Sequence, residues 1–81
     1  METHVVGRVT DIIAKALGLS PGSVKEEDAI DSFEAWDSLG HLSILTALDK
    51  EFGGRVAKVP GLAKATSVKA ILCLLQEHQI V

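Results

Sequence analysis

A serine at the expected start of a helix is the residue of this sequence best placed to do chemistry. Ser38 lies in the string WDSLGHL, residues 36–42, which leads into an apolar repeat with helical spacing. Asp37 is the kind of short acidic residue preferred just before a first helical turn, so we expect it to be the N-cap. Backbone N–H groups and the helix dipole favour an anion at that end. A phosphate ester on the Ser38 hydroxyl would therefore be stabilised there.

The other titratable and nucleophilic side chains form no recognisable catalytic or metal-binding pattern. His4, His41 and His78 lie on different segments and share no ligand spacing. Cys73 is the only cysteine, which excludes a zinc site built from cysteines. The carboxylates between residues 26 and 37 do not follow the EF-hand series. We therefore expect no catalytic residue and no metal ligand, and we interpret His41 as a surface or partner-contact residue rather than a general base.

Three apolar repeats at three- and four-residue spacing predict the helices that position this serine. They cover residues 3–17, residues 38–52, and a last segment that starts at residue 66 or 67 and ends near 78. A proline at its start predicts a short helical turn over residues 60–65. The predicted fold class is therefore all-α: a small antiparallel bundle of three main helices plus one short helix, in a single domain over residues 1–81.

The apolar residues of these repeats supply the expected core. Trp36 is expected to anchor the long connection of residues 18–37, because its burial offsets the entropy lost on ordering that connection. Cys73 lies in an apolar stretch, which predicts a core or half-buried position. The predicted buried stripe of the second helix consists of Leu39, Leu42, Leu45, Leu48 and Phe52, widened by Ile44.

Length, composition and charge set limits on the class of protein. The chain has 81 residues, of which 47% are hydrophobic and 23% are charged. This length and composition indicate one small globular domain. A net charge of −3 argues against binding nucleic acid by charge alone. No apolar run is long enough to span a bilayer, and the first residues do not have the pattern of a signal peptide. We expect a soluble protein of a reducing compartment, which we take to be the cytoplasm.

The segment around Ser38, near the middle of a short acidic chain and after a long first loop, resembles the Asp-Ser-Leu attachment motif of acyl carrier proteins. In that family the serine carries a 4′-phosphopantetheine arm whose thiol holds acyl groups as thioesters. The resemblance implies that Ser38 is the attachment site, that Asp37 caps the helix and meets the modifying transferase, and that Leu39 is an exposed apolar contact. The positions expected to contact partner enzymes are Leu39, His41, Asp49 and Glu51. Those that the resemblance suggests for an acyl chain are Leu45, Leu48, Ile71 and Leu75.

The function implied by this resemblance is that of an acyl carrier, not an enzyme. The implied cofactor is 4′-phosphopantetheine, bound covalently to Ser38. The implied partners are a phosphopantetheinyl transferase and the enzymes that load and process acyl groups in a fatty acid, polyketide or related specialised pathway. We expect a monomer that binds neither nucleic acid nor membrane.

Two departures keep alternatives open. Gly40, Ser43 and Lys50 stand where relatives of fatty acid synthesis commonly have acidic residues, which weakens steering toward basic partners and suggests a specialised pathway. Residues 39–43 also resemble, superficially, the Gly-Gly-His-Ser-Leu motif of peptidyl carriers, which would make Ser43 the attachment site. We prefer Ser38, because one glycine of that motif is missing and Ser43 lies a full turn into the helix. An aminoacyl or peptidyl cargo remains the alternative.

A rival from another class is a helical interaction module, such as a helix-turn-helix DNA-binding protein. Its only support is a basic tract in the second part of the chain. Residues 1–49 have nine acidic and three basic residues, whereas residues 50–81 have two acidic and five basic ones. The basic tract is Arg55, Lys58, Lys64 and Lys69. A helix rich in base-reading side chains is missing, and the net negative charge also disfavours this hypothesis.

Overall fold

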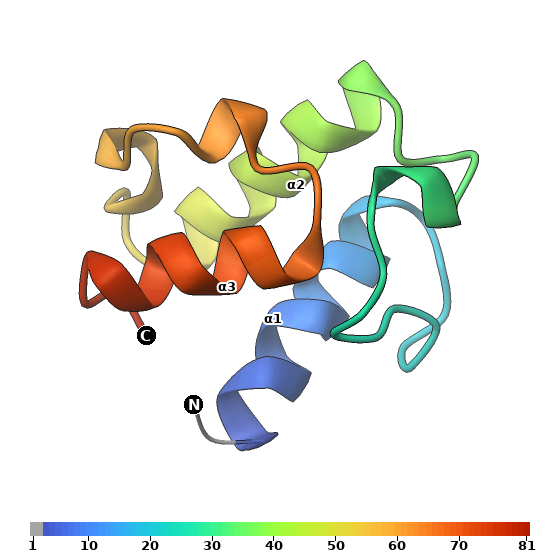
Figure 1. Cartoon of the computed structure of the whole chain (residues 1–81), viewed down its shortest axis with the longest axis horizontal. Helices are drawn as coiled ribbons and strands as arrows, with labels where there is room; N and C mark the ends of the chain where they lie inside the picture. Colours follow the sequence, from blue (N-terminus) through green and yellow to red (C-terminus); the bar gives the residue numbers. More distant parts are fainter. Residues whose placement is uncertain (1–2) are drawn as a thin grey trace.

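The computed structural model describes residues 3–81 and contains three α-helices and three short 3₁₀ turns. In Figure 1, α2 and α3 both run from right to left, and α1 runs back in the opposite direction. This arrangement confirms the predicted small helical bundle. The elements are α1 (Thr3–Ala16), η1 (Ile30–Ser32), α2 (Ser38–Glu51), η2 (Val56–Lys58), η3 (Leu62–Lys64) and α3 (Val68–Glu77).

Local signals in the sequence explain where the helices begin and end. The Asp37 side chain accepts a hydrogen bond from the Gly40 N–H at 2.8 Å, which confirms the predicted N-cap of α2. Ser67 caps α3 in the same way, through the Ala70 N–H at 3.1 Å. Gly18 ends the first helical segment with a φ of 75°, a conformation that glycine adopts without strain. The predicted turn over residues 60–65 is present as η3.

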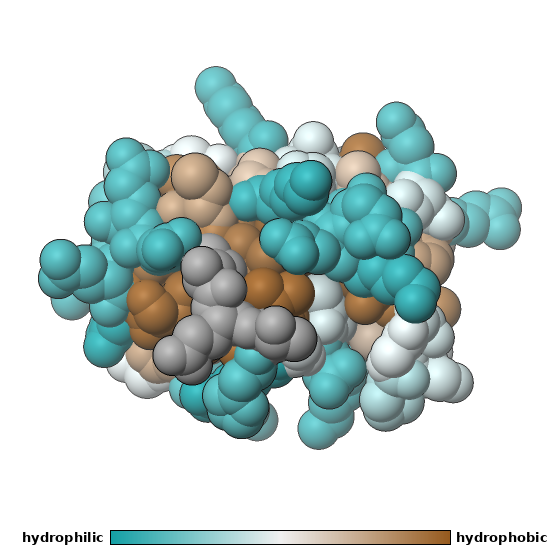
Figure 2. Space-filling model, turned by 60° about the horizontal axis from the view of Figure 1, so that its bottom comes forward, coloured by the Kyte–Doolittle hydropathy of each residue, from teal (hydrophilic) through white to brown (hydrophobic). Residues whose placement is uncertain are grey.

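The three helices share one hydrophobic core. Its largest fully buried side chains include Ile13 of α1, Ile44 and Leu48 of α2, and Ile71 of α3. Trp36 joins them from the long connection and is only 1% exposed, which confirms its predicted role as an anchor. Hydrophobic side chains also reach the surface on the lower face of the molecule, where hydrophilic side chains surround them (Figure 2). Within residues 3–81, no helix combines the length and apolar character needed to cross a bilayer.

The predicted buried stripe of α2 is wrong in its first half. Leu39 is 76% exposed and Leu42 is 61% exposed, whereas the buried residues of the helix are His41, Ile44 and Leu48. Positions 41, 44 and 48 follow helical spacing as well as the leucines do, so the helix offers two stripes. The packing of the long connection against α2 selects the stripe that contains the histidine.

The prediction that Cys73 is buried or half-buried is also wrong, because its side chain is exposed on α3. Ile71, Leu72 and Leu75 already occupy the side of this helix that faces the core. Position 73 therefore turns toward solvent, although its sequence neighbours are apolar.

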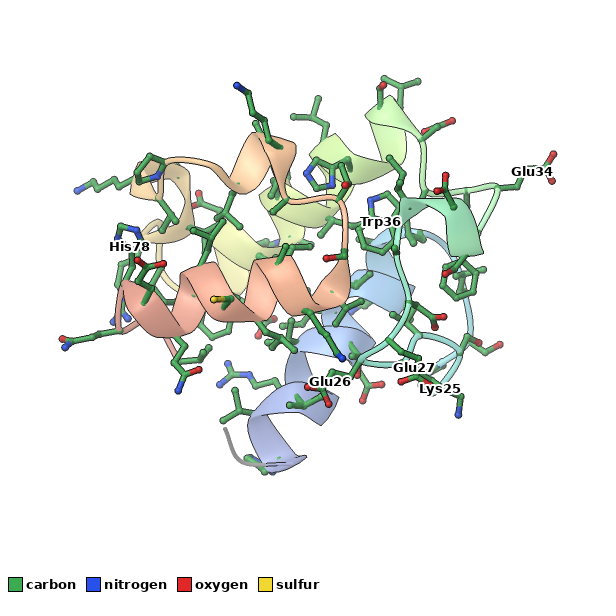
Figure 3. All side chains as sticks on the ribbon, viewed as in Figure 1. Lys25, Glu26, Glu27, Glu34, Trp36 and His78 are labelled. Carbon is green, nitrogen blue, oxygen red and sulfur yellow. The ribbon has the colours of Figure 1, made fainter. Side chains whose placement is uncertain are left out.

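The long connection of residues 18–37 is fixed at several points. Besides Trp36, Val24 is buried in the core. The Ile30 N–H donates to the Thr66 carbonyl at 2.8 Å and the Val68 N–H donates to the Asp28 carbonyl at 3.0 Å, which ties the connection to the start of α3. Most of its acidic residues are exposed, and Glu34 projects away from the molecule in Figure 3. The connection is therefore an ordered acidic loop.

Candidate functional site

Ser38 is the first residue of α2 and is exposed to solvent. Asp37 precedes it in an extended conformation and holds the first turn through the Gly40 N–H. The cap therefore fixes the position of the serine without covering it. An enzyme that modifies hydroxyl groups has access to this side chain from outside the molecule.

Gly40 allows the acidic loop to cross the first turn of α2. A methyl group added at this position would overlap the Ala35 carbonyl oxygen and would also press on the Leu17 side chain, at 3.0 Å. Any side chain larger than hydrogen would push the loop away from the helix. Packing against the loop thus requires a glycine at position 40.

The prediction that His41 is a surface residue is wrong: its side chain is 7% exposed and links three segments of the molecule. The Trp36 Nε1–H donates to His41 Nδ1 at 3.1 Å, and His41 Nε2 lies 2.9 Å from the Leu62 carbonyl oxygen of η3. The indole is only a donor and the carbonyl only an acceptor, so Nε2 carries the proton of a neutral imidazole. Both nitrogens are occupied, and His41 is unsuited to serve as a base for Ser38.

Two large apolar side chains lie exposed beside the serine. Leu39 follows Ser38 directly, and Leu42 lies one helical turn further along. Residues three positions apart in a helix are neighbours on its surface, so the two exposed leucines form one small apolar patch. The apolar spacing predicted burial of both leucines, whereas the family resemblance implied an exposed Leu39. The exposure of Leu39 agrees with the second expectation, and its role as a partner contact stays a prediction.

A hollow of about 290 Å³ opens along the same side of α2. Leu45 lies seven positions after Ser38, which returns to the same side of a helix about 10 Å further along the axis. The side chains that surround the hollow are mostly apolar, and η2 and η3 form its other wall. Its lining residues are Leu45, Thr46, Asp49, Val56, Ala57, Val59, Leu62 and Ala63.

The residues suggested for an acyl chain divide between this hollow and the core. Leu45 lines the hollow. Leu48, Ile71 and Leu75 lie in the core, where each side chain is 0% exposed. Leu62, whose carbonyl contacts His41, lines the hollow from η3. The histidine thus positions one wall of the hollow, a role that the sequence analysis did not predict.

The two acidic residues predicted as partner contacts lie on different sides of α2. Asp49 borders the hollow, and its Oδ1 accepts the Ala57 N–H of η2 at 2.8 Å. Glu51 faces α1, where its carboxylate lies 3.4 Å from the Arg8 guanidinium. The same Arg8 lies over the Phe52 ring, 5.1 Å from its centroid. Both carboxylates are therefore engaged in contacts within the molecule.

Between residues 3 and 81, no three His, Cys, Asp or Glu side chains are grouped so that they could hold a metal ion. No protein-family model, curated protein or solved structure matches this chain.

Proposed function

We propose that this protein is an acyl carrier whose 4′-phosphopantetheine arm is attached to Ser38. The observation that carries the proposal is a geometric one: an exposed serine at the capped start of α2 lies on the same side of that helix as an apolar hollow. Leu42 and Leu45 follow Ser38 along this side of α2, and they would lie beside an arm attached to the serine. The Asp-Ser-Leu motif and the placement of its serine support the same assignment.

The attachment reaction needs little from this chain except an accessible hydroxyl. In the active site of a phosphopantetheinyl transferase, Ser38 Oγ attacks the β-phosphorus of coenzyme A. The new Oγ–P bond replaces the bond to adenosine 3′,5′-bisphosphate, which leaves, and the transferase removes the proton of the serine. When bound, the arm supplies a thiol that holds an acyl group as a thioester. Because His41 has both nitrogens engaged, we assign the base to the transferase and no enzymatic activity to this protein.

The hollow suits part of a short apolar cargo. At about 290 Å³ it lies just below the range for small-molecule pockets, which begins at roughly 300 Å³. Its apolar lining would shield a short acyl chain from water, while the tether keeps the thioester at a high local concentration for each docked enzyme. We place the protein in the cytoplasm as a monomer that serves a fatty acid, polyketide or related specialised pathway.

The proposal is tested by intact mass spectrometry after incubation with coenzyme A and a broad-specificity phosphopantetheinyl transferase. We expect the mass of one phosphopantetheine to be added to the wild type and to Ser43→Ala, and no addition to Ser38→Ala. Addition that is lost only in Ser43→Ala would move the attachment site to the position of a peptidyl-type carrier. No addition to folded protein, with a control carrier modified in parallel, would refute the proposal and favour a helical interaction module.

A further inference from the structure

Another cavity lies between α1 and α2, and we call it the α1–α2 groove. Its volume is about 260 Å³, close to the 290 Å³ of the hollow. Leu45 of the hollow and Ala47 of the groove are two positions apart, which turns them about 200° around the helix axis. The two cavities therefore open on opposite sides of α2. The residues that line the groove are Ile12, Lys15, Ala16, Ala47, Lys50 and Glu51.

The floor of the groove is apolar. Ala16 of α1 and Ala47 of α2 are half-buried, and their small side chains leave space between the two helices. Ile12 is half-buried beside them. A short aliphatic chain placed here would remove apolar surface of all three side chains from water, which favours binding.

The rim of the groove has an unpaired positive charge. Lys15 and Lys50 line it from one helix each, and both are exposed. Glu51 also lines it, but its carboxylate lies 3.4 Å from the Arg8 guanidinium, in the only ion pair among residues 3–81. Asp11 lies four positions before Lys15 but forms no ion pair with it and does not line the groove. The two lysines are therefore free to meet an anion.

The lining of the hollow has the opposite charge. Its one charged residue is Asp49, which is half-buried. A carboxylate held near Asp49 would be repelled, whereas a carboxylate near Lys15 and Lys50 would be attracted. Two cavities of similar size and similar apolar character are thus distinguished by charge. A small molecule with an apolar chain and an anionic end should prefer the groove.

We propose that the α1–α2 groove binds a short aliphatic carboxylate. The chain lies against Ile12, Ala16 and Ala47, and the carboxylate meets the ammonium groups of Lys15 and Lys50 at the rim. This site includes neither Ser38 nor the hollow and needs no covalent step. The proposal is therefore independent of the carrier function.

Three probes with the same six-carbon chain test the proposal: hexanoate, 1-hexanol and hexylammonium. Each is titrated at pH 7 into the ¹⁵N-labelled, unmodified protein, and backbone amide shifts give the affinity and the site. We expect hexanoate to cause saturable shifts centred on Ala16 and Ala47 and to bind at least about threefold more tightly than 1-hexanol, as two exposed ion pairs allow. Hexylammonium should bind there more weakly than 1-hexanol. The advantage of hexanoate should shrink as salt is added.

Variants of exposed residues provide the matched controls. Lys15→Gln/Lys50→Gln should reduce hexanoate binding to the level of 1-hexanol. Lys25→Gln/Lys69→Gln removes the same charge at two exposed positions that do not line the groove, and it should leave the preference intact. Glu51→Gln removes the carboxylate of the lining and releases Arg8, so it should strengthen hexanoate binding.

The proposal is overturned by equal or weaker binding of hexanoate relative to 1-hexanol, or by the absence of a saturable shift. Hexanoate shifts centred on Leu45 and Ala57 would place the ligand in the hollow and would also overturn it. So would an unchanged hexanoate affinity in Lys15→Gln/Lys50→Gln. Phosphopantetheine addition at Ser38 is measured separately by mass, so a failure of this proposal is distinguishable from a failure of the carrier proposal.

Discussion

At the scale of single residues, His41 does the most to connect parts of the molecule that are distant in sequence. It holds the indole of Trp36 on one side and the carbonyl of Leu62 on the other, at 3.1 and 2.9 Å. When the partner of a buried polar group is removed, the folded state becomes less stable, because water cannot reach the group to replace the lost hydrogen bond. The histidine is therefore part of the fold as well as a support for the hollow.

We predict that His41→Phe lowers the free energy of unfolding by about 1–3 kcal/mol, because it leaves the buried Trp36 indole N–H without a partner. The Leu62 carbonyl loses one of its two donors and keeps the Ala65 N–H. Urea denaturation followed by circular dichroism measures the change. His78→Phe is the control, since His78 is exposed at the end of α3, and it should change stability by no more than about 0.5 kcal/mol. Equal stability of the two variants would show that the hydrogen bonds of His41 are unimportant.

At the scale of elements, the acidic loop crosses α2 at Gly40, whereas the other helical glycine, Gly7, has no such neighbour. Gly7 lies in α1 with nothing within 4 Å of an added methyl group, whereas Gly40 lies under the Ala35 carbonyl. Alanine favours a helix over glycine by about 1 kcal/mol at either position. The difference between the two sites therefore comes from packing alone.

We predict that Gly7→Ala raises the free energy of unfolding by about 0.5–1 kcal/mol and that Gly40→Ala lowers it by about 1–3 kcal/mol. Thermal and urea unfolding of both variants measure the two signs. Stabilisation by Gly40→Ala would mean that the loop does not cross the helix as closely as described. Because the crossing lies next to Ser38, Gly40→Ala should also slow addition of phosphopantetheine by the transferase.

The extents of the helices were predictable from the sequence because their signals are local. Apolar spacing marked each helix, and Asp37 and Ser67 marked two starts that the structure confirms. The rotation of α2 was not predictable in this way. Its leucines and the stripe through His41 have equal spacing, and the choice depends on Trp36 and Leu62, which lie on other segments. The exposed serine was thus predictable, but the wall of the hollow was not.

At the scale of the whole molecule, one core serves all the elements. Residues from α1, α2, α3, η2, η3 and the acidic loop belong to the same buried cluster. The loop is also joined to the start of α3 by backbone hydrogen bonds at Ile30 and Val68. No part of residues 3–81 has a core of its own that would persist after the rest unfolds.

We predict a single cooperative unfolding transition for the protein. Trp36 is the only tryptophan, so its fluorescence reports on the loop and its contact with α2, while far-ultraviolet circular dichroism reports on all helices. The midpoints from the two probes should coincide in urea, as they do for two-state domains of this size. A fluorescence change that precedes loss of helix would show that the acidic loop detaches first.

Cys73 lies exposed on α3, and it is the only thiol that the sequence itself provides. A thiol reagent will therefore react with the unmodified protein. If the proposed arm is attached to Ser38, a thiol count should rise from one group to two. Replacement by Cys73→Ser is expected to be mild, because the side chain is outside the core. In that background a maleimide or crosslinker would report on the arm alone, and oxidation would no longer join two molecules through α3.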